Sequence, residues 1–330
     1  MKERITPHLR ALIDAGSEAI KNQFVKIKNK TRKKKFPELD PLGEERTYSP
    51  VKGLVHKYNR VVLIKTSDRC AAHCQFCTRY RDIGSGDGDL TRENILEIIE
   101  YIKNHTEISE VILSGGDPFF TPNTTFTILE LLEPIKSVKV IRIGTRLPVH
   151  APDNFKSKKV QEVLEKIEKM NRYTNPVHIL IHFNHPDEIT TKTIDVIWML
   201  RQKGIMLFSQ TVFLNGVNFF ENVDSETKDA DVSLSVDLLD KLFTKLHSLG
   251  VIPYYIYRCD YVSGLEHFVV PFEKEVKIMI ELWKRLPGLA LPQYIFDAPD
   301  GRGKIRVPLL PWKKRGIHSF HDIDGKIIKV

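Results

Sequence analysis

Cysteine is scarce in this sequence, with four residues among 330. So few cysteines in so long a chain cannot form the framework of a disulfide-rich secreted domain, and they indicate a reducing, cytoplasmic setting. Long hydrophobic runs are also missing, because no stretch of about 18 apolar residues occurs and Met1–Gly16 carries no cleavage site. We therefore expect neither a transmembrane helix nor a secretory signal. Internal repeats and low-complexity linkers are absent, and 28% charged with 42% hydrophobic residues indicates a globular chain.

The charge balance is basic, with 50 Lys and Arg against 42 Asp and Glu and a net charge of +8. Many of the basic residues form a run near the N-terminus, and a run of this kind can bind nucleic acid or an acidic partner, or can be a solvated arm. No aromatic signature of RNA binding accompanies it, so we do not expect a nucleic-acid partner. Much of the excess gathers near the N-terminus, at Lys21, Lys26, Lys28, Lys30, Arg32, Lys33, Lys34 and Lys35.

From Val61 onward, short β-branched runs alternate with amphipathic helical windows. This alternation indicates βαβ units and a parallel sheet, arranged either as an open doubly wound sheet or as a partial barrel of six units. The predicted strands are Val61–Thr66, Val111–Leu113, Val138–Ile143, Val177–Ile181, Met206–Val212 and Tyr254–Tyr257, with a last apolar stretch at Leu289–Phe296. The predicted helical faces include Ile95, Ile98, Ile99 and Ile102; Ile128, Leu131 and Leu132; Val160, Val163, Leu164 and Ile167; Thr190–Leu200; Leu234, Leu238, Leu242 and Leu246; and Phe272–Arg285.

Unusual polar residues fall where the predicted strands end. Barrel enzymes build their active sites at the carboxyl ends of the strands, so this placement indicates an enzyme. We expect a basic N-terminal extension over 1–50, a core barrel over 51–307 and a closing tail over 308–330. The strand-end groups are the cysteines after the first strand, Ser114–Pro118 after the second, Arg146 after the third, His182 and His185 after the fourth, and Asp260 after the sixth.

Three of the four cysteines, Cys70, Cys74 and Cys77, lie in one loop with the spacing C-x₃-C-x₂-C. Three thiolates leave one iron of a [4Fe–4S] cluster without a protein ligand, and an open iron can bind and polarise a substrate. Two alternatives are zinc bound by the three cysteines and His73, and a chance grouping of buried cysteines. Chance is improbable for three out of four, and zinc loops usually show paired CxxC elements. The spacing therefore favours the cluster.

This loop, placed after the first strand, resembles that of the radical S-adenosylmethionine (radical SAM) enzymes. The resemblance implies a [4Fe–4S] cluster whose open iron binds SAM and whose electron cleaves SAM to a 5′-deoxyadenosyl radical. Gly115, Gly116 and Asp117 resemble the family's GGE-type motif, which contacts the SAM amino group. Glycine suits such a position because its backbone can closely approach a ligand.

A more specific resemblance covers about Lys52 to Val307, where the sequence is similar to lysine 2,3-aminomutase and its relatives. Seven blocks in the same order are far more specific than any one of them. They are His56–Tyr58, Cys77–Arg79, Arg142–Arg146, His182–Pro186, Gln210–Asn218, Tyr254–Asp260 and Asp297–Lys304.

This second resemblance implies a site for pyridoxal 5′-phosphate (PLP). Lys304 matches the catalytic lysine that carries PLP as a Schiff base, and Gly301 and Gly303 beside it provide a small, flexible backbone. Lys57 and Tyr58 match positions that hold the phosphate and ring. Arg60 belongs to the same set, although it lies one residue earlier than in the family pattern. Without the family, Lys304 would read as an ordinary surface lysine in a glycine-rich turn.

The substrate residues follow from the same resemblance. Arg79 matches the residue that binds the substrate carboxylate through its planar guanidinium. Asp260 and Asp297 match the two carboxylates that receive the distant ammonium of lysine, and glutamate-selective relatives replace these acids. Alternatively, either aspartate caps a turn or pairs with Arg258 or Arg302. Arg146, His182 and Gln210 are further candidates for SAM contacts, together with Asn184 and His185, although a histidine at a strand end is often a core residue.

The resemblance thus implies a radical SAM, PLP-dependent 2,3-aminomutase that moves the α-amino group of an L-amino acid, first of all L-lysine, to the β-carbon. The expected partners are a small amino acid and an electron donor such as flavodoxin or ferredoxin, without a membrane, in a possible homo-oligomer. The zinc site that larger relatives build from extra cysteines should be absent, since only Cys259 remains. Three alternatives stay open: the same reaction on arginine or another amino acid, a radical SAM enzyme that modifies RNA or protein, and a non-catalytic metal-binding nucleic-acid module.

Overall fold

One curved sheet forms the centre of the described structure, and strands that are neighbours in sequence are also neighbours in the sheet. The computed structural model describes residues 3–26, 40, 42–86, 88–221, 229–299 and 301–307, and the backbone of 319–321 and 327–329. The strands are β1 (Leu54–Tyr58), β2 (Val61–Lys65), β3 (Glu110–Ser114), β4 (Val140–Thr145), β5 (Val177–His182), β6 (Leu207–Val212), β7 (Val251–Tyr257), β8 (Gln293–Ala298) and β9 (Gly303–Arg306).

Strands β2 to β8 are parallel, whereas β1 and β9 run antiparallel at the two edges. The sheet curves so far that its two edge strands come close together. The backbone N–H of Lys304 on β9 donates to the Tyr58 hydroxyl on β1 over 2.9 Å. The prediction of a partial α/β barrel is confirmed, and the apolar stretch before Phe296 supplies a seventh parallel strand, β8. The edge strands β1 and β9 were not predicted.

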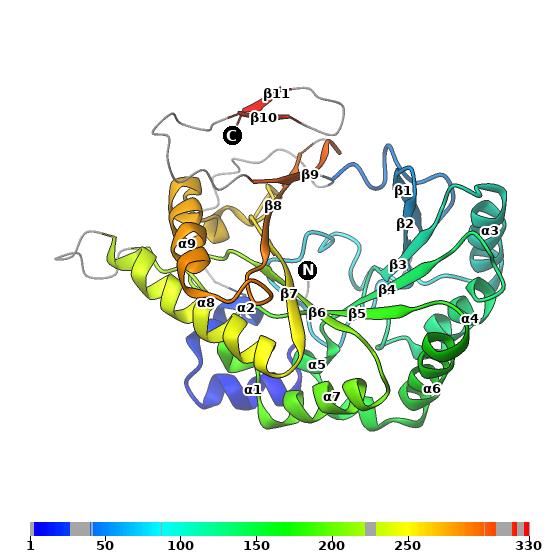
Figure 1. The fold of residues 1–330 in the computed structure, drawn as a ribbon, viewed down its shortest axis with the longest axis horizontal. Coiled ribbons are helices and arrows are strands. Elements are labelled where there is room, and N and C mark those ends of the chain that lie inside the picture. The colour runs from blue at the N-terminus through cyan, green and yellow to red at the C-terminus, as the bar shows by residue number, and fades with distance from the viewer. Residues whose placement is uncertain are drawn as a thin grey trace.

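Helices cover the outside of the sheet, as Figure 1 shows. This arrangement follows from βαβ crossovers, in which a helix on the outer face carries the chain back to the end of the sheet where the previous strand began. The helices are α3 (Arg92–Asn104), α4 (Pro122–Leu132), α5 (Leu147–His150), α6 (Lys158–Tyr173), α7 (Thr191–Gln202), α8 (Ala230–Ser248) and α9 (Phe272–Arg285), with 3₁₀ turns η1 (Pro152–Lys156), η2 (Pro186–Glu188) and η3 (Glu266–Phe268).

Helix α3 shows how the sequence specifies these elements. Thr91 caps its N-terminus in a capping box with Asn94, which satisfies backbone N–H groups that the first turn leaves without partners. The four predicted isoleucines, Ile95 to Ile102, are all at most 5% exposed. Burial of each such side chain contributes about 1.5–3 kcal/mol, so this face fixes the helix against the sheet.

The predicted face of helix α8 is partly wrong. Leu234 is 42% exposed, whereas Leu242 and Leu246 are buried as predicted. A strict four-residue repeat advances by about 40° per step around a helix of 3.6 residues per turn, so it leaves the buried face. The buried side chains instead follow mixed three- and four-residue steps and include Val232, Val236, Leu239, Leu242, Phe243 and Leu246.

The first described residues form two short helices, α1 (Pro7–Asp14) and α2 (Glu18–Phe24), within the segment that we expected to be an extension. Thr6 and Ser17 cap them with their hydroxyl oxygens. Leu9, Ile20 and Phe24 are fully buried in the main core cluster. These helices therefore pack against the barrel, whereas the basic residues from Lys28 to Lys35 lie outside the described residues.

The predicted C-terminal tail is described only as the backbone of β10 (Ser319–His321) and β11 (Ile327–Lys329), which pair antiparallel. No helix in the described part of the chain is both long and apolar enough to span a bilayer.

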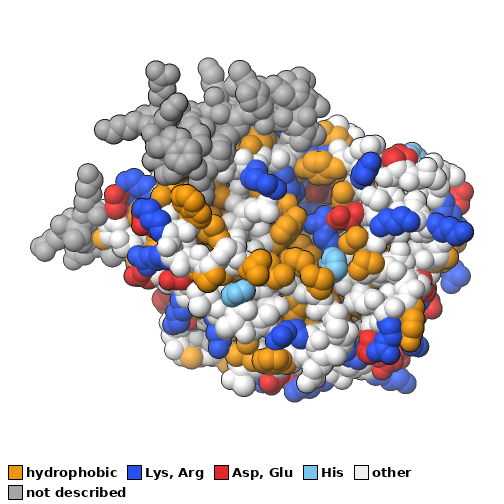
Figure 2. Space-filling model, in the orientation of Figure 1, with side chains coloured by type: hydrophobic (Ala, Val, Ile, Leu, Met, Phe, Trp, Pro, Cys, Tyr) orange, Lys and Arg blue, Asp and Glu red, His pale blue; other side chains and the backbone are white. Residues whose placement is uncertain are grey.

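Figure 2 shows the surface in the orientation of Figure 1, with hydrophobic side chains in the middle of the visible face and basic, acidic and histidine side chains among them. This face therefore exposes both apolar and charged side chains.

Candidate active site

The strand-end residues predicted from the sequence gather at the carboxyl edge of the sheet. The cysteine loop follows β2, and the Ser114–Pro118 motif follows β3. Their backbones bind each other, since Gly116 N donates to Ser67 O over 2.6 Å and Asp117 N donates to Arg69 O over 2.8 Å. The motif therefore supports the loop that carries the three cysteines.

The two glycines of this motif make that contact possible. A Cβ on Gly116 would stand 2.2 Å from the Arg69 carbonyl oxygen, and one on Gly115 would stand 2.8 Å from the Ser67 carbonyl oxygen. Gly115 also has φ +104°, which L side chains rarely adopt. We expected the glycines to admit a ligand, and the close approach that the structure shows is that of the cysteine loop.

Asp117 joins the ends of β3 and β4. Its carboxylate accepts hydrogen bonds from the Thr145 hydroxyl at 2.8 and 2.9 Å, from Arg146 N at 2.7 Å and from Phe119 N at 3.1 Å. Burial raises the pKa of Asp117, and these donors partly offset that shift. Its side chain thus fixes the loop that leads to Arg146, while its predicted contact with SAM stays a prediction.

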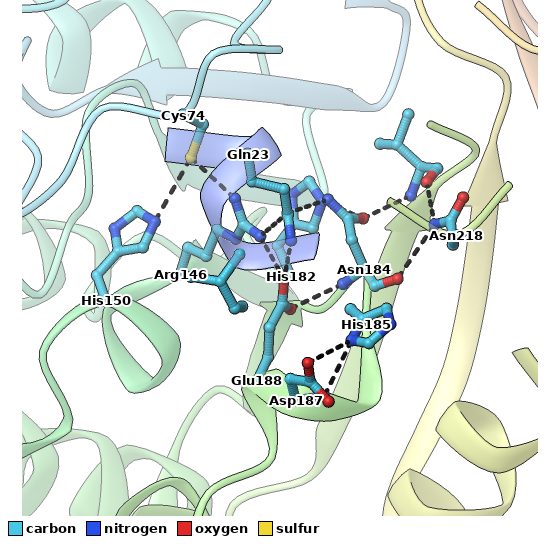
Figure 3. A network of polar contacts seen from close by, with 12 residues as sticks. Gln23, Cys74, Arg146, His150, His182, Asn184, His185, Asp187, Glu188 and Asn218 are labelled. Carbon is cyan, nitrogen blue, oxygen red and sulfur yellow. Dashed lines mark hydrogen bonds and ion pairs between the residues drawn. The ribbon is translucent and has the colours of Figure 1, made fainter. Parts of the chain in front are cut away.

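Arg146 lies at the centre of a buried polar network that reaches one of the cysteines (Figure 3). Its Nη1 donates to Cys74 Sγ over 2.9 Å, and its Nη2 donates to Gln23 Oε1 at 2.5 Å and to Glu188 Oε1 at 2.8 Å. Glu188 and Gln23 are fully buried. The structure therefore places Arg146 beside the cysteine loop, and its predicted bond to the SAM carboxylate is untested.

The sequence analysis missed Gln23 and Glu188. Gln23 lies on α2 among Ala19, Ile20 and Phe24, all of which are buried. A glutamine on an otherwise apolar helix face was the available signal, because a buried amide needs polar partners. Those partners are distant in sequence, so the pattern alone could not name them.

Lys304 and Asp297 face each other across the last strand pair. They are direct partners in the β8–β9 ladder, and Lys304 Nζ donates to Asp297 Oδ2 over 2.7 Å. Lys57 Nζ on β1 lies 3.7 Å from Asp297 Oδ1. Desolvation lowers the pKa of Lys304, but the negative charge of Asp297 and the hydrogen bond to it outweigh that effect and hold the pKa well above its ordinary value.

The turn before Lys304 is fixed by the segment before β1. Tyr48 donates its hydroxyl to Gly301 O over 3.1 Å. Gly301 has φ +70°, and a Cβ there would stand 2.7 Å from the Tyr48 ring. Glycine is therefore required at this turn by both backbone conformation and packing.

Asp260 follows β7 and belongs to the same group. Burial and the neighbouring Asp297 raise the pKa of Asp260 well above its ordinary range. Arg258 does not neutralise this pair through the contacts described, because it bonds to Glu275 and, over 2.9 Å, to the Tyr261 hydroxyl. The alternative in which Arg258 pairs with the acids is therefore not supported.

Arg79 forms a bidentate ion pair that the sequence analysis missed. Its Nε donates to Glu44 Oε2 over 2.8 Å and its Nη2 donates to Glu44 Oε1 over 2.7 Å, while Nη1 lies 3.5 Å from the Ser114 hydroxyl. Burial would raise the pKa of Glu44, but the charge and hydrogen bonds of Arg79 outweigh it and lower the pKa to about 2. Both groups are therefore charged at neutral pH.

Comparison with known proteins places this site in a family. Residues 64–224 match the model of the radical SAM superfamily. A relative from Aquifex aeolicus is 38% identical over 88% of this chain and 73% of its own length. The L-lysine 2,3-aminomutase of Clostridium subterminale is 34% identical over 94% of this chain and 69% of its own length. The chain belongs to the lysine 2,3-aminomutase family. The glutamate 2,3-aminomutase of Clostridioides difficile is also similar, at 33% identity over 89% of this chain and 64% of its own length.

Enzymes of the lysine 2,3-aminomutase family use a [4Fe–4S] cluster, SAM and PLP. Cys70, Cys74 and Cys77 lie together in one described loop after β2, as three protein ligands of such a cluster would. Burial and then the nearby Cys74 raise the pKa of Cys77 to about 12. Cationic iron would stabilise thiolates in such a place. Membership of this family favours the cluster over the zinc alternative with His73.

PLP also fits the residues that this family would use. Lys304 would supply the amine, and Lys57 and Tyr58 lie on β1 at the facing edge of the sheet. Lys57 lies within ion-pair distance of Asp297, whose Oδ1 is buried without a hydrogen-bond partner. Arg60 is exposed on the turn between β1 and β2, and no described contact joins it to this group, so its role stays a prediction.

The remaining predicted residues of this aminomutase lie around the Arg146 network. His182 Nε2 lies 2.9 Å from Asn184 Oδ1, and burial followed by the charge of Arg146 lowers the pKa of His182 to about 3. His182 is therefore neutral. Gln210 Nε2 donates to the Tyr257 hydroxyl over 3.4 Å. His185 points instead to Asp187, 3.4 Å away (Figure 3).

Proposed function

We propose that this protein is a PLP-dependent radical SAM aminomutase that moves the α-amino group of L-lysine to its β-carbon. The observation that carries the choice of lysine is the contact between Lys304 and Asp297. There, a lysine side chain of the protein itself already places a primary ammonium 2.7 Å from a buried carboxylate. A substrate ammonium of the same chemistry would bind the same oxygen.

The pair of acids strengthens this argument. Asp297 is buried and Asp260 is partly buried, and desolvation followed by the charge of Asp297 raises the pKa of Asp260. A second cation beside Asp260 and Asp297 would relieve the repulsion between them, whereas the side-chain carboxylate of glutamate would increase it. Family membership alone does not distinguish these substrates, because the relatives include a glutamate 2,3-aminomutase.

The residues of the chain then have separate tasks. Arg79 would bind the α-carboxylate, and Asp260 and Asp297 would hold the distant ammonium. Cys70, Cys74 and Cys77 would hold the cluster, and Lys304 would hold PLP. When bound, SAM with the reduced cluster supplies a hydrogen-abstracting radical, and PLP supplies a conjugated ring that stabilises unpaired electron density during the nitrogen shift. The enclosing barrel would exclude water and other quenchers from the reacting atoms.

We infer three further features of the working protein. The cluster needs one electron from outside, so a small electron-transfer protein such as flavodoxin or ferredoxin is the proposed reductant. The scarcity of cysteine supports a cytoplasmic location, and a homo-oligomer is a further proposal. Reduction assays with each donor protein test the reductant, and native mass spectrometry tests the oligomeric state.

The deciding experiment uses protein reconstituted anaerobically with iron, sulfide, PLP and SAM and reduced with dithionite. L-Lysine, L-arginine and L-glutamate are offered separately, and β-amino acids are detected by mass spectrometry after derivatisation. We expect β-lysine from the wild type and its loss in Asp260→Asn. The exposed Asp195 on α7 gives the matched control Asp195→Asn, which should retain activity.

The other outcomes each change the proposal. A β-amino acid from arginine but not lysine would keep the reaction and replace the substrate. SAM cleavage to 5′-deoxyadenosine without any β-amino acid would keep the radical chemistry and reject aminomutase action on these three amino acids.

A further inference from the structure

Glu44 is the bidentate ion-pair partner of Arg79, the residue assigned to the substrate carboxylate. We propose that Glu44 is a positioning residue that holds Arg79 by its Nε–Nη2 edge and so presents the adjacent Nη1–Nη2 edge of its guanidinium to the α-carboxylate. This inference deepens the proposed function and rests on it.

The geometry of the guanidinium carries the first step. Glu44 occupies the edge formed by Nε and Nη2, at 2.8 and 2.7 Å. A guanidinium has a second bidentate edge, formed by Nη1 and Nη2, and its five N–H donors are arranged in a fixed plane. That second edge lies on the side of Ser114, 3.5 Å from Nη1, at the carboxyl end of β3. Glu44 thus leaves one edge for a second carboxylate.

A cavity adjoins Arg79, and the ion pair beside it is largely buried. Arg79, Ser67 and Gly115 line a cavity of about 230 Å³. The Arg79 side chain is only 18% exposed, and that of Glu44 is 11% exposed. Because both side chains are largely buried, the pair cannot sample the many orientations of a surface ion pair, and the free edge has a defined direction.

The segment that carries Glu44 also connects the two ends of the site. Glu44 N donates to Asp40 Oδ1 over 3.1 Å, and Tyr48, four residues later, binds Gly301 in the turn before Lys304. A Cβ on Gly43 would stand 3.4 Å from Gly301 Cα. The carboxylate-binding arginine and the PLP lysine are therefore held by one short segment, which fixes the distance between them.

The test compares Glu44→Gln with wild type, using PLP-loaded protein without a cluster. Amino acid binding is followed by the change in the PLP absorption spectrum, with L-lysine and L-lysinamide as ligands. A glutamine offers only one acceptor to the two N–H groups, so we expect L-lysine to bind about tenfold more weakly, which corresponds to ~1.4 kcal/mol. L-Lysinamide lacks the carboxylate, so its binding should be unchanged.

The control variant is Glu110→Gln, which removes the carboxylate of another partly buried pair, Glu110 with Arg142, at the opposite end of β3. It should bind both ligands as wild type does. Glu44→Asp keeps the charge but shortens the side chain, so it should weaken L-lysine selectively even if Glu44→Gln folds poorly. In the reconstituted enzyme, Glu44→Gln should raise KM for L-lysine and leave kcat nearly unchanged.

Three results would overturn the inference. Tighter L-lysine binding in Glu44→Gln would mean that Glu44 competes with the substrate for Arg79, and equal weakening of both ligands would mean a general structural role. Unchanged binding of both would mean that Arg79 needs no partner. If wild type showed no spectral change with L-lysine, the proposed function would fail first and the inference with it.

Discussion

Replacement of Gly116 by alanine tests whether the glycine motif supports the cysteine loop. The added Cβ would stand 2.2 Å from Arg69 O, about 1.2 Å closer than ordinary contact at 3.4 Å. The obstacle is backbone, so the loop itself must move. Such overpacking costs about 1–3 kcal/mol, and loss of the two backbone hydrogen bonds to Ser67 and Arg69 adds about 0.5–1.5 kcal/mol each.

We therefore expect Gly116→Ala to lose about 2–6 kcal/mol of stability and to lower the Tm by about 5 °C or more. Displacement of the loop should also reduce the iron and sulfide bound per chain after anaerobic reconstitution. The matched control is Gly288→Ala, because a Cβ at Gly288 meets nothing within 4 Å. Full cluster content and an unchanged Tm in Gly116→Ala would refute the reasoning.

Three other predictions test separate parts of the structure. Lys304→Ala should abolish the PLP absorption that borohydride treatment fixes covalently in wild type while leaving the iron content unchanged; retention of covalent PLP would contradict the assignment. Ile99→Ala, at a position 3% exposed on α3, should cost about 2–5 kcal/mol in denaturant unfolding, whereas Leu96→Ala, 47% exposed on the same helix, should cost far less. The pKa of Glu44 falls from an ordinary 4.5 to about 2 in the folded state, so its stabilisation is present above pH 4.5 and is lost as the pH falls toward 2. Unfolding between pH 5 and 2 should therefore show a loss, on the order of 3 kcal/mol, that Glu44→Gln lacks; equal acid sensitivity of both proteins would argue against the ion pair.

Much of the fold could be predicted because local periodicity reflects burial. The isoleucines of α3 follow the helical repeat and are all buried, and α9 spans the predicted Phe272–Arg285. The edge strands β1 and β9 escaped prediction since they contain charged residues such as Lys57 and Lys304, and β9 has only four residues. An edge strand has only one paired side, so its sequence need not be as apolar as that of a central strand.

The candidate site was predictable where its residues form contiguous motifs. Cys70, Cys74 and Cys77 share one loop, and the strand-end rule places the other groups at the same edge. Glu44 and Gln23 were not predictable, because their partners Arg79 and Arg146 lie 35 and 123 residues away in sequence. Only the folded chain shows which buried charges compensate each other.

The closure of the barrel has a consequence for its dynamics. Within the described strands, no backbone ladder joins β1 to β9. The hydrogen bond from Lys304 N to the Tyr58 hydroxyl bridges these strands, and Lys57 Nζ on β1 lies 3.7 Å from Asp297 Oδ1 on the neighbouring β8. A ladder opens cooperatively, but one bond can break alone, so the Lys304 amide should exchange its hydrogen faster than amides inside the parallel strands. A cofactor held by Lys57 and Tyr58 on β1 and by Lys304 on β9 would link the two edge strands and slow their separation. Amide exchange at Lys304 would then report cofactor loading directly.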